Sequence, residues 1–478
     1  MSTPQGMSEP NRQRVVMLVN NPCVNDSRVI REAEALAGAG YEVVVVARSG
    51  PGLPVEQCVR DVRYIRVPGL TEPGQDRRTA IRRWSHSLRY RVAGGASSLC
   101  AWVGVLIGAL AMPVAAALWP LLMARQMRAG QLRSPAGHGP AVPAEGAPRP
   151  SRRQMLKAWL SRQILTFLLF EDVEVAMAQA ALALQPSILH AHDLGTLPTA
   201  GEVARRLGAR LVYDSHELEL HRNARYSMVG QWWRAWLERH YIARTAAVIT
   251  VSDGIADHLA AQYSIARPLV VLNSPAYEAI SQRSTQSVRG VVGLPAEIPL
   301  AIYVGRVTTG RGIEQCIRML RHYPQLHFAV VGPRAPVAVQ FAMLAAAEGV
   351  AQRYHVVDPV PSAQVVSFVR DADVSVVAIQ NVCLSYYYCM PNKLLESVMG
   401  GLPVVVSNLP ELRRFVESNR CGEVMDESSP SAIAAAVRKV IENRAAYQLD
   451  PVPLQNVRRQ YGWDAQACVL LDGYRSLR

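Results

Sequence analysis

Short apolar runs alternate with amphipathic segments over most of the chain. The first two runs, Arg14 to Val19 and Tyr41 to Ala47, enclose a helical pattern from Ser27 to Gly38, which predicts a β-α-β unit. After residue 180 the same alternation returns. Further strands are expected at Ser187 to His190, Arg210 to Tyr213, Ala247 to Val251 and Leu269 to Leu272, with helices at Pro198 to Leu207, Trp232 to Ala246 and Gly254 to Gln262.

A second lobe is expected to begin after the turn Asn273-Ser274-Pro275 and a polar segment that ends near residue 290. Its strands are expected at 300–303, 327–331, 354–357, 374–377 and 403–406, and its last helices at 431–443 and 463–477. The fold class is therefore α/β, with two Rossmann-like doubly wound lobes that face a central cleft. The expected lobes are 1–275 and 290–460, and the helix at 461–478 is expected to cross back to the first lobe.

An insertion of about residues 70–170 interrupts the first lobe. Residues 92–124 contain no charge, and their apolar centre, 99–123, is about long enough to cross a bilayer. A single crossing would separate strands of one sheet, so the pattern favours a re-entrant or in-plane helical hairpin broken near Pro113. A buried core helix is the alternative. Residues 126–153 have the composition of a linker, and 155–170 fit either the membrane surface or the helical layer of the lobe.

The positive charge of the chain is concentrated around this apolar segment. Between Arg77 and Arg162 there are 14 Lys or Arg residues and one acid, which accounts for the whole net charge of +13. Nucleic acid is not expected as a partner, because basic residues that bracket an apolar segment instead suit an anionic membrane surface. The eight cysteines lack metal-ligand spacing, and residues 1–14 lack the apolar stretch of a signal peptide. We expect a cytoplasmic protein, peripheral or monotopic at the inner face of the cell membrane.

The most informative motif runs from Pro391 to Pro403 and leads into the strand Val404 to Val406. It predicts a short helix with Asn392 at its start and Glu396 one turn later, at the carboxyl edge of a parallel sheet where such folds bind ligands. An ordinary βα unit with a glycine helix stop is the alternative.

A Gly-Arg turn is expected after the first strand of the second lobe. Gly305 allows close backbone approach, and Arg306 and Arg311 can converge on one diphosphate. The alternative is a solvated loop. Val330-Val331-Gly332-Pro333 ends a neighbouring strand, and the backbone turn at Gly332 could receive a nucleotide base.

Together these motifs resemble family 4 of the retaining GT-B glycosyltransferases. The resemblance covers nearly all of the chain outside residues 70–170. Two further stretches are similar to a bacterial polysaccharide-assembly branch of that family: Asn25-Asp26-Ser27-Arg28-Val29-x-Arg31-Glu32, and His190-Ala191-His192-Asp193 together with Tyr213-Asp214-Ser215-His216-Glu217.

The resemblance implies a donor site in the second lobe. Arg306 and Arg311 match the basic residues that hold the diphosphate of a sugar nucleotide, beside Gly305 and Gly332. Glu396 matches the carboxylate that binds the ribose. The position where the family often has a second glutamate, in contact with the donor sugar, is Tyr388 here. Tyr388 is kept among the expected donor-binding residues, and Asn392 or Lys393 is expected to supply part of the contact to the sugar.

The resemblance also implies the contribution of the first lobe. His192 matches a histidine near the transferred sugar, where it hydrogen-bonds a hydroxyl, and a core histidine is the alternative. The catalytic set is then His192, Arg306, Arg311 and Glu396. Asn25, Asp193, His216 and Glu217 are expected on the acceptor side.

No metal or cofactor is expected, because the two arginines replace a metal beside the UDP- or GDP-linked sugar that serves as co-substrate. Asp371-Ala372-Asp373 is interpreted as a cap on the opposite edge of the sheet. The expected acceptor is a lipid-linked saccharide in cell-surface polysaccharide assembly. A sugar-nucleotide epimerase and a non-catalytic GT-B subunit that acts as a membrane scaffold are the alternatives.

Overall fold

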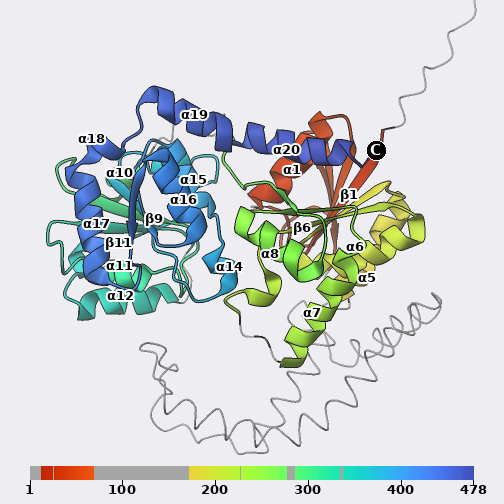
Figure 1. Ribbon diagram of the computed structural model, residues 1–478, viewed down its shortest axis with the longest axis horizontal. Helices are drawn as coiled ribbons and strands as arrows, with labels where there is room; N and C mark the ends of the chain where they lie inside the picture. The colour runs from red at the N-terminus through yellow and green to blue at the C-terminus, as the bar shows by residue number, and fades with distance from the viewer. Residues whose placement is uncertain are drawn as a thin grey trace, which may run out of the picture. The chain divides into compact units, whose positions relative to one another are not determined.

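The computed structural model describes residues 12–24, 26–68, 172–224, 226, 228–276, 286–333 and 337–477. Figure 1 shows two sheets with helices packed against them, and each sheet forms the centre of one lobe. The expected pair of Rossmann-like parallel sheets is confirmed.

The sheet of the first lobe has eight strands in the order β3-β4-β2-β1-β5-β6-β7-β8. The strands are β1 (Arg14–Val19), β2 (Glu42–Arg48), β3 (Glu56–Val59), β4 (Val62–Val67), β5 (Ile188–His192), β6 (Arg210–Ser215), β7 (Ala247–Thr250) and β8 (Leu269–Val270). All pair in parallel except β3, which is antiparallel to β4. The central strands β1 and β5 are buried along nearly their whole length, as is typical of parallel strands covered by helices on both faces. For example, residues 15–19 are all buried.

The helices described in this lobe are α1 (Ser27–Gly38), α5 (Asp172–Leu184), α6 (Asp193–Leu207), the 3-10 helix η1 (Glu219–His221), α7 (Met228–Ile242) and α8 (Asp253–Tyr263). Helix α6 begins five residues earlier than expected, because Pro198 lies inside the helix rather than in the first turn that proline favours. Strands β3 and β4 were not predicted. Their hairpin turns at Arg60 and Asp61, both with positive φ, and the sequence there lacks the glycine that usually marks such a turn.

The sheet of the second lobe has six parallel strands in the order β11-β10-β9-β12-β13-β14. The strands are β9 (Leu300–Val304), β10 (His327–Val331), β11 (Tyr354–Val357), β12 (Val374–Val377), β13 (Val404–Ser407) and β14 (Gly422–Met425). Its helices are α10 (Val288–Val292), α11 (Ile313–Met319), α12 (Val337–Ala347), η2 (Ala351–Arg353), α13 (Val365–Phe368), α14 (Leu384–Tyr387), α15 (Asn392–Met399), α16 (Pro410–Asn419), α17 (Pro430–Glu442) and α18 (Arg444–Tyr447). Beta-branched residues dominate the strands, which suits a sheet buried on both faces.

The last two helices, α19 (Pro451–Tyr461) and α20 (Trp463–Arg475), follow the second lobe in sequence. Helix α20 packs against α1 of the first lobe (Figure 1), and Trp463, Leu470 and Tyr474 belong to the same buried cluster as Met17. The hydroxyl of Tyr474 lies 2.6 Å from Nδ1 of His190. The end of the chain therefore contributes to the core of the first lobe.

The expected membrane segment at 92–124, the linker at 126–153 and the amphipathic stretch at 155–170 lie outside the described residues. Within the described part of the chain, every helix is too short or too polar to cross a bilayer.

Candidate active site

Two strand ends of the second lobe meet backbone to backbone. Gly305 follows β9 with φ of 124°, in the region that glycine favours. A Cβ atom on Gly332, at the end of β10, would lie 2.0 Å from the carbonyl oxygen of Gly305. Only glycine fits this approach, so these two turns are held together at the carboxyl edge of the sheet.

Two arginines flank the Gly305 turn. Arg306 is exposed, and its carbonyl oxygen accepts a 2.8 Å hydrogen bond from the hydroxyl of Tyr303. The guanidinium of Arg311 lies 4.5 Å from the ring centroid of Tyr386, in a cation–π arrangement. The buried Nε of Arg311 has no hydrogen-bond partner in the part of the chain described.

Helix α15 brings a third basic side chain to the same turn. Nζ of Lys393 lies 3.5 Å from the ring centroid of Tyr303 and 3.6 Å from the place where a Cβ on Gly305 would be. This amine is buried and has no hydrogen-bond partner among the described residues. Burial and the neighbouring Arg311 hold the pKa of Lys393 well below its usual value.

Glu396 lies one turn after Asn392, the first residue of α15. Burial raises the pKa of its carboxyl, and Arg31 and Lys393 oppose that effect. Arg31 belongs to α1 of the first lobe, so the electrostatic environment of Glu396 includes both lobes. The structure thus groups Gly305, Arg311, Lys393 and Glu396.

Tyr388 lies elsewhere. Its ring packs on Gly254 of α8, where an added Cβ would come within 2.3 Å of Cδ1. Its carbonyl oxygen accepts a 2.6 Å hydrogen bond from the hydroxyl of Ser252. Tyr388 joins the two lobes in these contacts, and its expected role at the donor sugar stays a prediction.

In the first lobe, His192 ends β5 and is 1% exposed. Its Nδ1 lies 3.3 Å from Oδ2 of Asp214 and 3.2 Å from Nε2 of His216. The Nε2 atom of His192 has no hydrogen-bond partner among the described residues. Burial lowers the pKa of this histidine, which favours the neutral ring.

Asp214 is held in place by several donors. Arg28 donates to both carboxylate oxygens of Asp214, each at 2.7 Å, and Nε2 of His216 lies 2.9 Å from Oδ2. Burial opposes ionisation of Asp214, but Arg28, His216 and His192 hold its pKa well below the usual value. Burial also opposes protonation of His216, but Asp193 and Asp214 raise its pKa to about 9.

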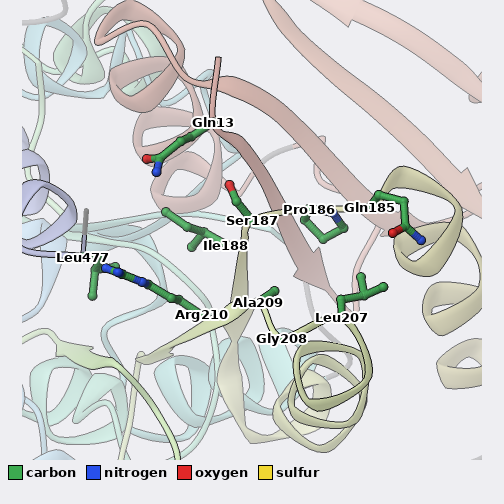
Figure 2. A pocket seen from close by; sticks show the side chains of 10 residues that line it. All are labelled: Gln13, Gln185, Pro186, Ser187, Ile188, Leu207, Gly208, Ala209, Arg210 and Leu477. Carbon is green, nitrogen blue, oxygen red and sulfur yellow. The ribbon is translucent and has the colours of Figure 1, made fainter. Parts of the chain in front are cut away.

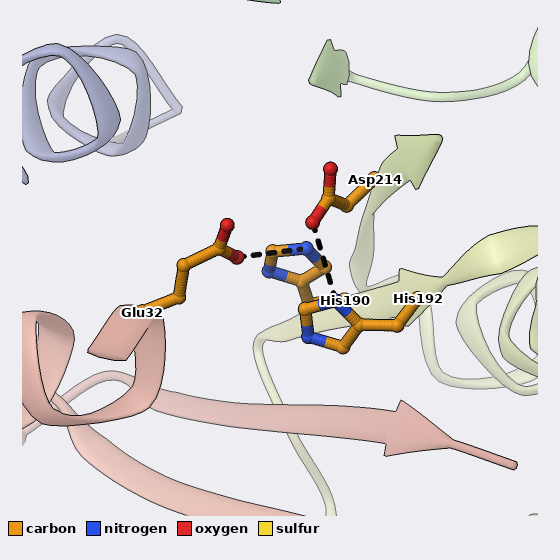
Figure 3. A group of neighbouring side chains, drawn as sticks. All are labelled: Glu32, His190, His192 and Asp214. Carbon is orange, nitrogen blue, oxygen red and sulfur yellow. Dashed lines mark ion pairs between the residues drawn. The ribbon is translucent and has the colours of Figure 1, made fainter. Parts of the chain in front are cut away.

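Four buried side chains could in principle hold a metal ion: Glu32, His190, His192 and Asp214, whose ligand atoms lie within 4.8 Å of one another. Figure 3 shows them facing one another. Arg28, however, contacts both carboxylates, at 3.1 Å from Glu32 and 2.7 Å from Asp214. Since this guanidinium would repel a metal cation, we interpret the group as an ion-pair network.

Of the other residues expected on the acceptor side, Asp193 lies beside His216 and Glu217 pairs with a surface arginine. Asp193 has φ of 59°, and its carboxylate lies 3.4 Å from Nδ1 of His216. Glu217 pairs with Arg222 at 3.1 Å, and Asn25 lies outside the described residues. Arg28, Glu32 and Asp214, which contact the histidines or one another, were not predicted as site residues although the quoted motifs contain all three.

The aspartates of Asp371-Ala372-Asp373 lie between α13 and β12. Arg289 donates from Nε to the carbonyl oxygen of Asp371 at 2.8 Å, and the Leu300 amide donates to Asp373 at 2.8 Å. The carboxylate of Asp373 therefore holds the start of β9, at the amino edge of the sheet.

A pocket of about 460 Å³ lies in the first lobe. Figure 2 shows Gln13, Ser187 and Arg210 among its lining side chains. These residues stand at the amino ends of β1, β5 and β6, whereas His192 stands at a carboxyl end. The pocket is thus separate from the candidate site.

Two protein-family models match parts of the chain. The family model "Glycosyl transferases group 1" matches residues 284–459, and the model "Glycosyltransferase Family 4" matches residues 132–275. A D-inositol 3-phosphate glycosyltransferase from Xylanimonas cellulosilytica is 28% identical over 192 residues, which are 39% of this chain and 45% of the relative. One from Corynebacterium diphtheriae is 25% identical over 48% of this chain and 51% of the relative. The chain thus spans about half the length of these curated relatives.

Solved structures share the fold. Sucrose-phosphate synthase from Thermosynechococcus elongatus superposes with a TM-score of 0.64 at 17% identity, over 98% of this chain and 99% of that chain. HepE from Anabaena, solved in complex with UDP-glucose, gives a TM-score of 0.60 at 10% identity, over 97% and 100% of the two chains. At these identities the likeness shows the GT-B fold alone. The two family models together match more than half of the 478 residues, and the chain belongs to glycosyltransferase family 4.

Proposed function

We propose that this protein transfers a glycosyl group, with retention, from a UDP- or GDP-linked sugar to a lipid-linked saccharide at the cytoplasmic face of a membrane. One observation carries the donor half of this proposal. Lys393 lies beside Gly305, Arg311 is close enough to lower the pKa of Lys393, and each keeps a buried nitrogen without a hydrogen-bond partner among the described residues. Leaving a buried polar group without a partner is costly, and a diphosphate would supply both hydrogen-bond acceptors and negative charge.

The chemistry follows from these groups. As the bond between sugar and diphosphate breaks, negative charge grows on the leaving diphosphate, and fixed cations stabilise that charge most in a site with little water. Arg306 and Arg311 would supply the cations, so the transfer needs no metal. Glu396 would accept hydrogen bonds from the ribose hydroxyls, which are stronger for a charged acceptor.

His192 would bind the transferred sugar from the first lobe. With its Nδ1 proton directed to Asp214, the neutral ring presents Nε2 as an acceptor for a sugar hydroxyl. The acceptor hydroxyl would then attack on the face that the diphosphate leaves, and Asp193, His216 and Glu217 would line its path.

The acceptor rests on a separate argument. The concentration of basic residues around an apolar segment at 77–162 favours an anionic membrane surface and hence a lipid-linked saccharide. The curated relatives are named for D-inositol 3-phosphate, which makes a phosphorylated polyol the second candidate acceptor.

Two other functions are kept as alternatives. A non-catalytic subunit would be expected to lose Arg306 or Glu396, and both residues are present. The second alternative is a sugar-nucleotide epimerase. A putative UDP-N-acetylglucosamine 2-epimerase from Listeria monocytogenes superposes on this chain with a TM-score of 0.52. An epimerase would not need the apolar insertion.

Calorimetric titration of the full chain with UDP and GDP, with and without Mg²⁺, tests the donor half. Tight, metal-independent binding of one nucleotide is expected, and binding of neither would favour the non-catalytic subunit. Nucleotide release from the matching sugar nucleotides would then be measured with lipid-linked saccharides and with inositol phosphate. Release that only inositol phosphate stimulates would overturn the lipid acceptor.

A further inference from the structure

We propose that Lys393 is a third cation of the diphosphate site and that it takes up a proton when the nucleoside diphosphate binds. This inference rests on the proposed function and extends it. The family resemblance assigns the diphosphate to Arg306 and Arg311 alone, and the sequence placed Lys393 at the donor sugar.

The position of the amine supports a role at the diphosphate. Lys393 is the second residue of α15 and is 7% exposed. Its Nζ lies over the Tyr303 ring at 3.5 Å, directed to the Gly305 backbone at 3.6 Å from the position of an added Cβ. Tyr303 in turn donates its hydroxyl proton to the carbonyl oxygen of Arg306. The amine therefore lies at the turn that carries the first diphosphate-binding arginine.

The groups around Lys393 do not neutralise a charge on it. The titratable groups that face it are Tyr303 from β9, Arg311 from the loop before α11, Cys316 from α11, Cys389 from the turn before α15, and Glu396 from α15 itself. Burial raises the pKa of Tyr303 and of Cys316 and raises that of Cys389 to about 12, so these three are neutral near pH 7. Glu396 favours the ammonium form, but burial and the repulsion from Arg311 outweigh it.

A buried amine without an anion is most stable in its neutral form. Burial and Arg311 accordingly hold the pKa of Lys393 well below its usual value. A bound diphosphate would place negative charge beside the amine and favour the ammonium form. The balance is simple: the neutral amine gains one proton from the solvent, and no covalent bond between heavy atoms changes.

Calorimetric titration of the full chain with UDP and with GDP at pH 8, in two buffers of different ionisation enthalpy, measures this proton. At that pH the terminal phosphate, with a pKa of about 6, is already ionised. The wild type should take up about one proton for each nucleotide bound. Lys393→Met keeps the side-chain volume and removes the amine. This variant should bind the nucleotide at least roughly 10-fold more weakly than the wild type, and it should take up no proton. A circular dichroism melt should show that this variant is folded, at an unfolding temperature no lower than that of the wild type.

Lys393→Arg is the matched variant, because its guanidinium keeps its proton in proteins. It should bind the nucleotide without proton uptake. Binding without uptake in the wild type, or equal uptake in the wild type and in Lys393→Met, would overturn the role of Lys393 and leave the donor site intact. Binding of neither nucleotide to the wild type would instead overturn the proposed function itself, and this inference with it.

Discussion

Gly254 in the first lobe lies directly under the ring of Tyr388 in the second lobe. A Cβ on Gly254 would stand 2.3 Å from Cδ1 of that ring and 3.1 Å from Oε1 of Glu411. Two hydrogen bonds flank this contact: Ser252 donates to the carbonyl oxygen of Tyr388 at 2.6 Å, and the Gly254 amide donates to Glu411 at 2.9 Å. The ring fills the space that a side chain at position 254 would need.

Gly254→Ala should therefore lower the free energy of unfolding, by about 1–3 kcal/mol as for other overpacked sites. In a double-mutant cycle, Tyr388→Ala should remove most of this cost, because the ring is the atom group that clashes. Urea unfolding of the four proteins measures the coupling. Additive effects would show that the two residues do not share this contact.

Arg306→Ala should weaken the binding of the recognised nucleotide by roughly 1.5–3 kcal/mol, the range for hydrogen bonds to charged groups. The fold should be unaffected because the side chain is exposed. Arg459→Ala, an exposed arginine on α19, is the matched control. Isothermal titration checks both variants, and wild-type affinity in Arg306→Ala would remove Arg306 from the diphosphate site.

Arg28→Met should cost about 3–5 kcal/mol of stability, because it leaves Asp214 and Glu32 buried without their cation. Chemical denaturation measures this loss. If the group is an ion-pair network, EDTA and micromolar Zn²⁺ should leave the unfolding temperature of the wild type unchanged. An unfolding temperature that EDTA lowers or that Zn²⁺ raises would instead identify a metal centre.

The stability of the fold should fall between pH 6.5 and 9. The pKa of His216 is raised to about 9 from an ordinary 6.5, so its protonated form stabilises the fold fully below pH 6.5. That contribution, at most about 3 kcal/mol, is lost as the pH rises through 9. His216→Gln should flatten the pH profile of unfolding, and His322→Gln, at an exposed position, should not. If the stability of the wild type and of His216→Gln changed with pH in the same way, His216 would not be the group responsible.

Deletion of residues 77–153 should reduce co-sedimentation with vesicles that contain anionic lipid. A second variant replaces the six arginines at 77, 78, 82, 83, 89 and 91 with glutamine. At roughly 1 kcal/mol for each charge near the surface, it should lose the salt-sensitive part of the binding and keep the apolar part. Sedimentation that neither change affects would refute a membrane role for the insertion.

Local pattern was enough to predict much of the fold. Strand β1, helix α1 and the strands β10, β11 and β12 have the bounds that their apolar runs predict. Long buried strands and amphipathic helices are encoded by neighbouring residues, so a single sequence shows them. The short hairpin β3–β4 was missed because pairing in the sheet overrides weak local signals. The early start of α6 was missed because Pro198, a residue typical of a first turn, lies inside the helix.

The sequence by itself determined the two-lobe α/β architecture, the position of the Gly305 turn and the residue types of the candidate donor site. Only the tertiary structure decided that Tyr388 packs on Gly254, that Arg28 joins Asp214 and Glu32, and that Lys393 lies over Tyr303. Each of these contacts joins residues far apart in sequence or depends on a side-chain direction. Such contacts depend on how packed elements exclude water and pair buried charges, and a local pattern of residues does not contain that information.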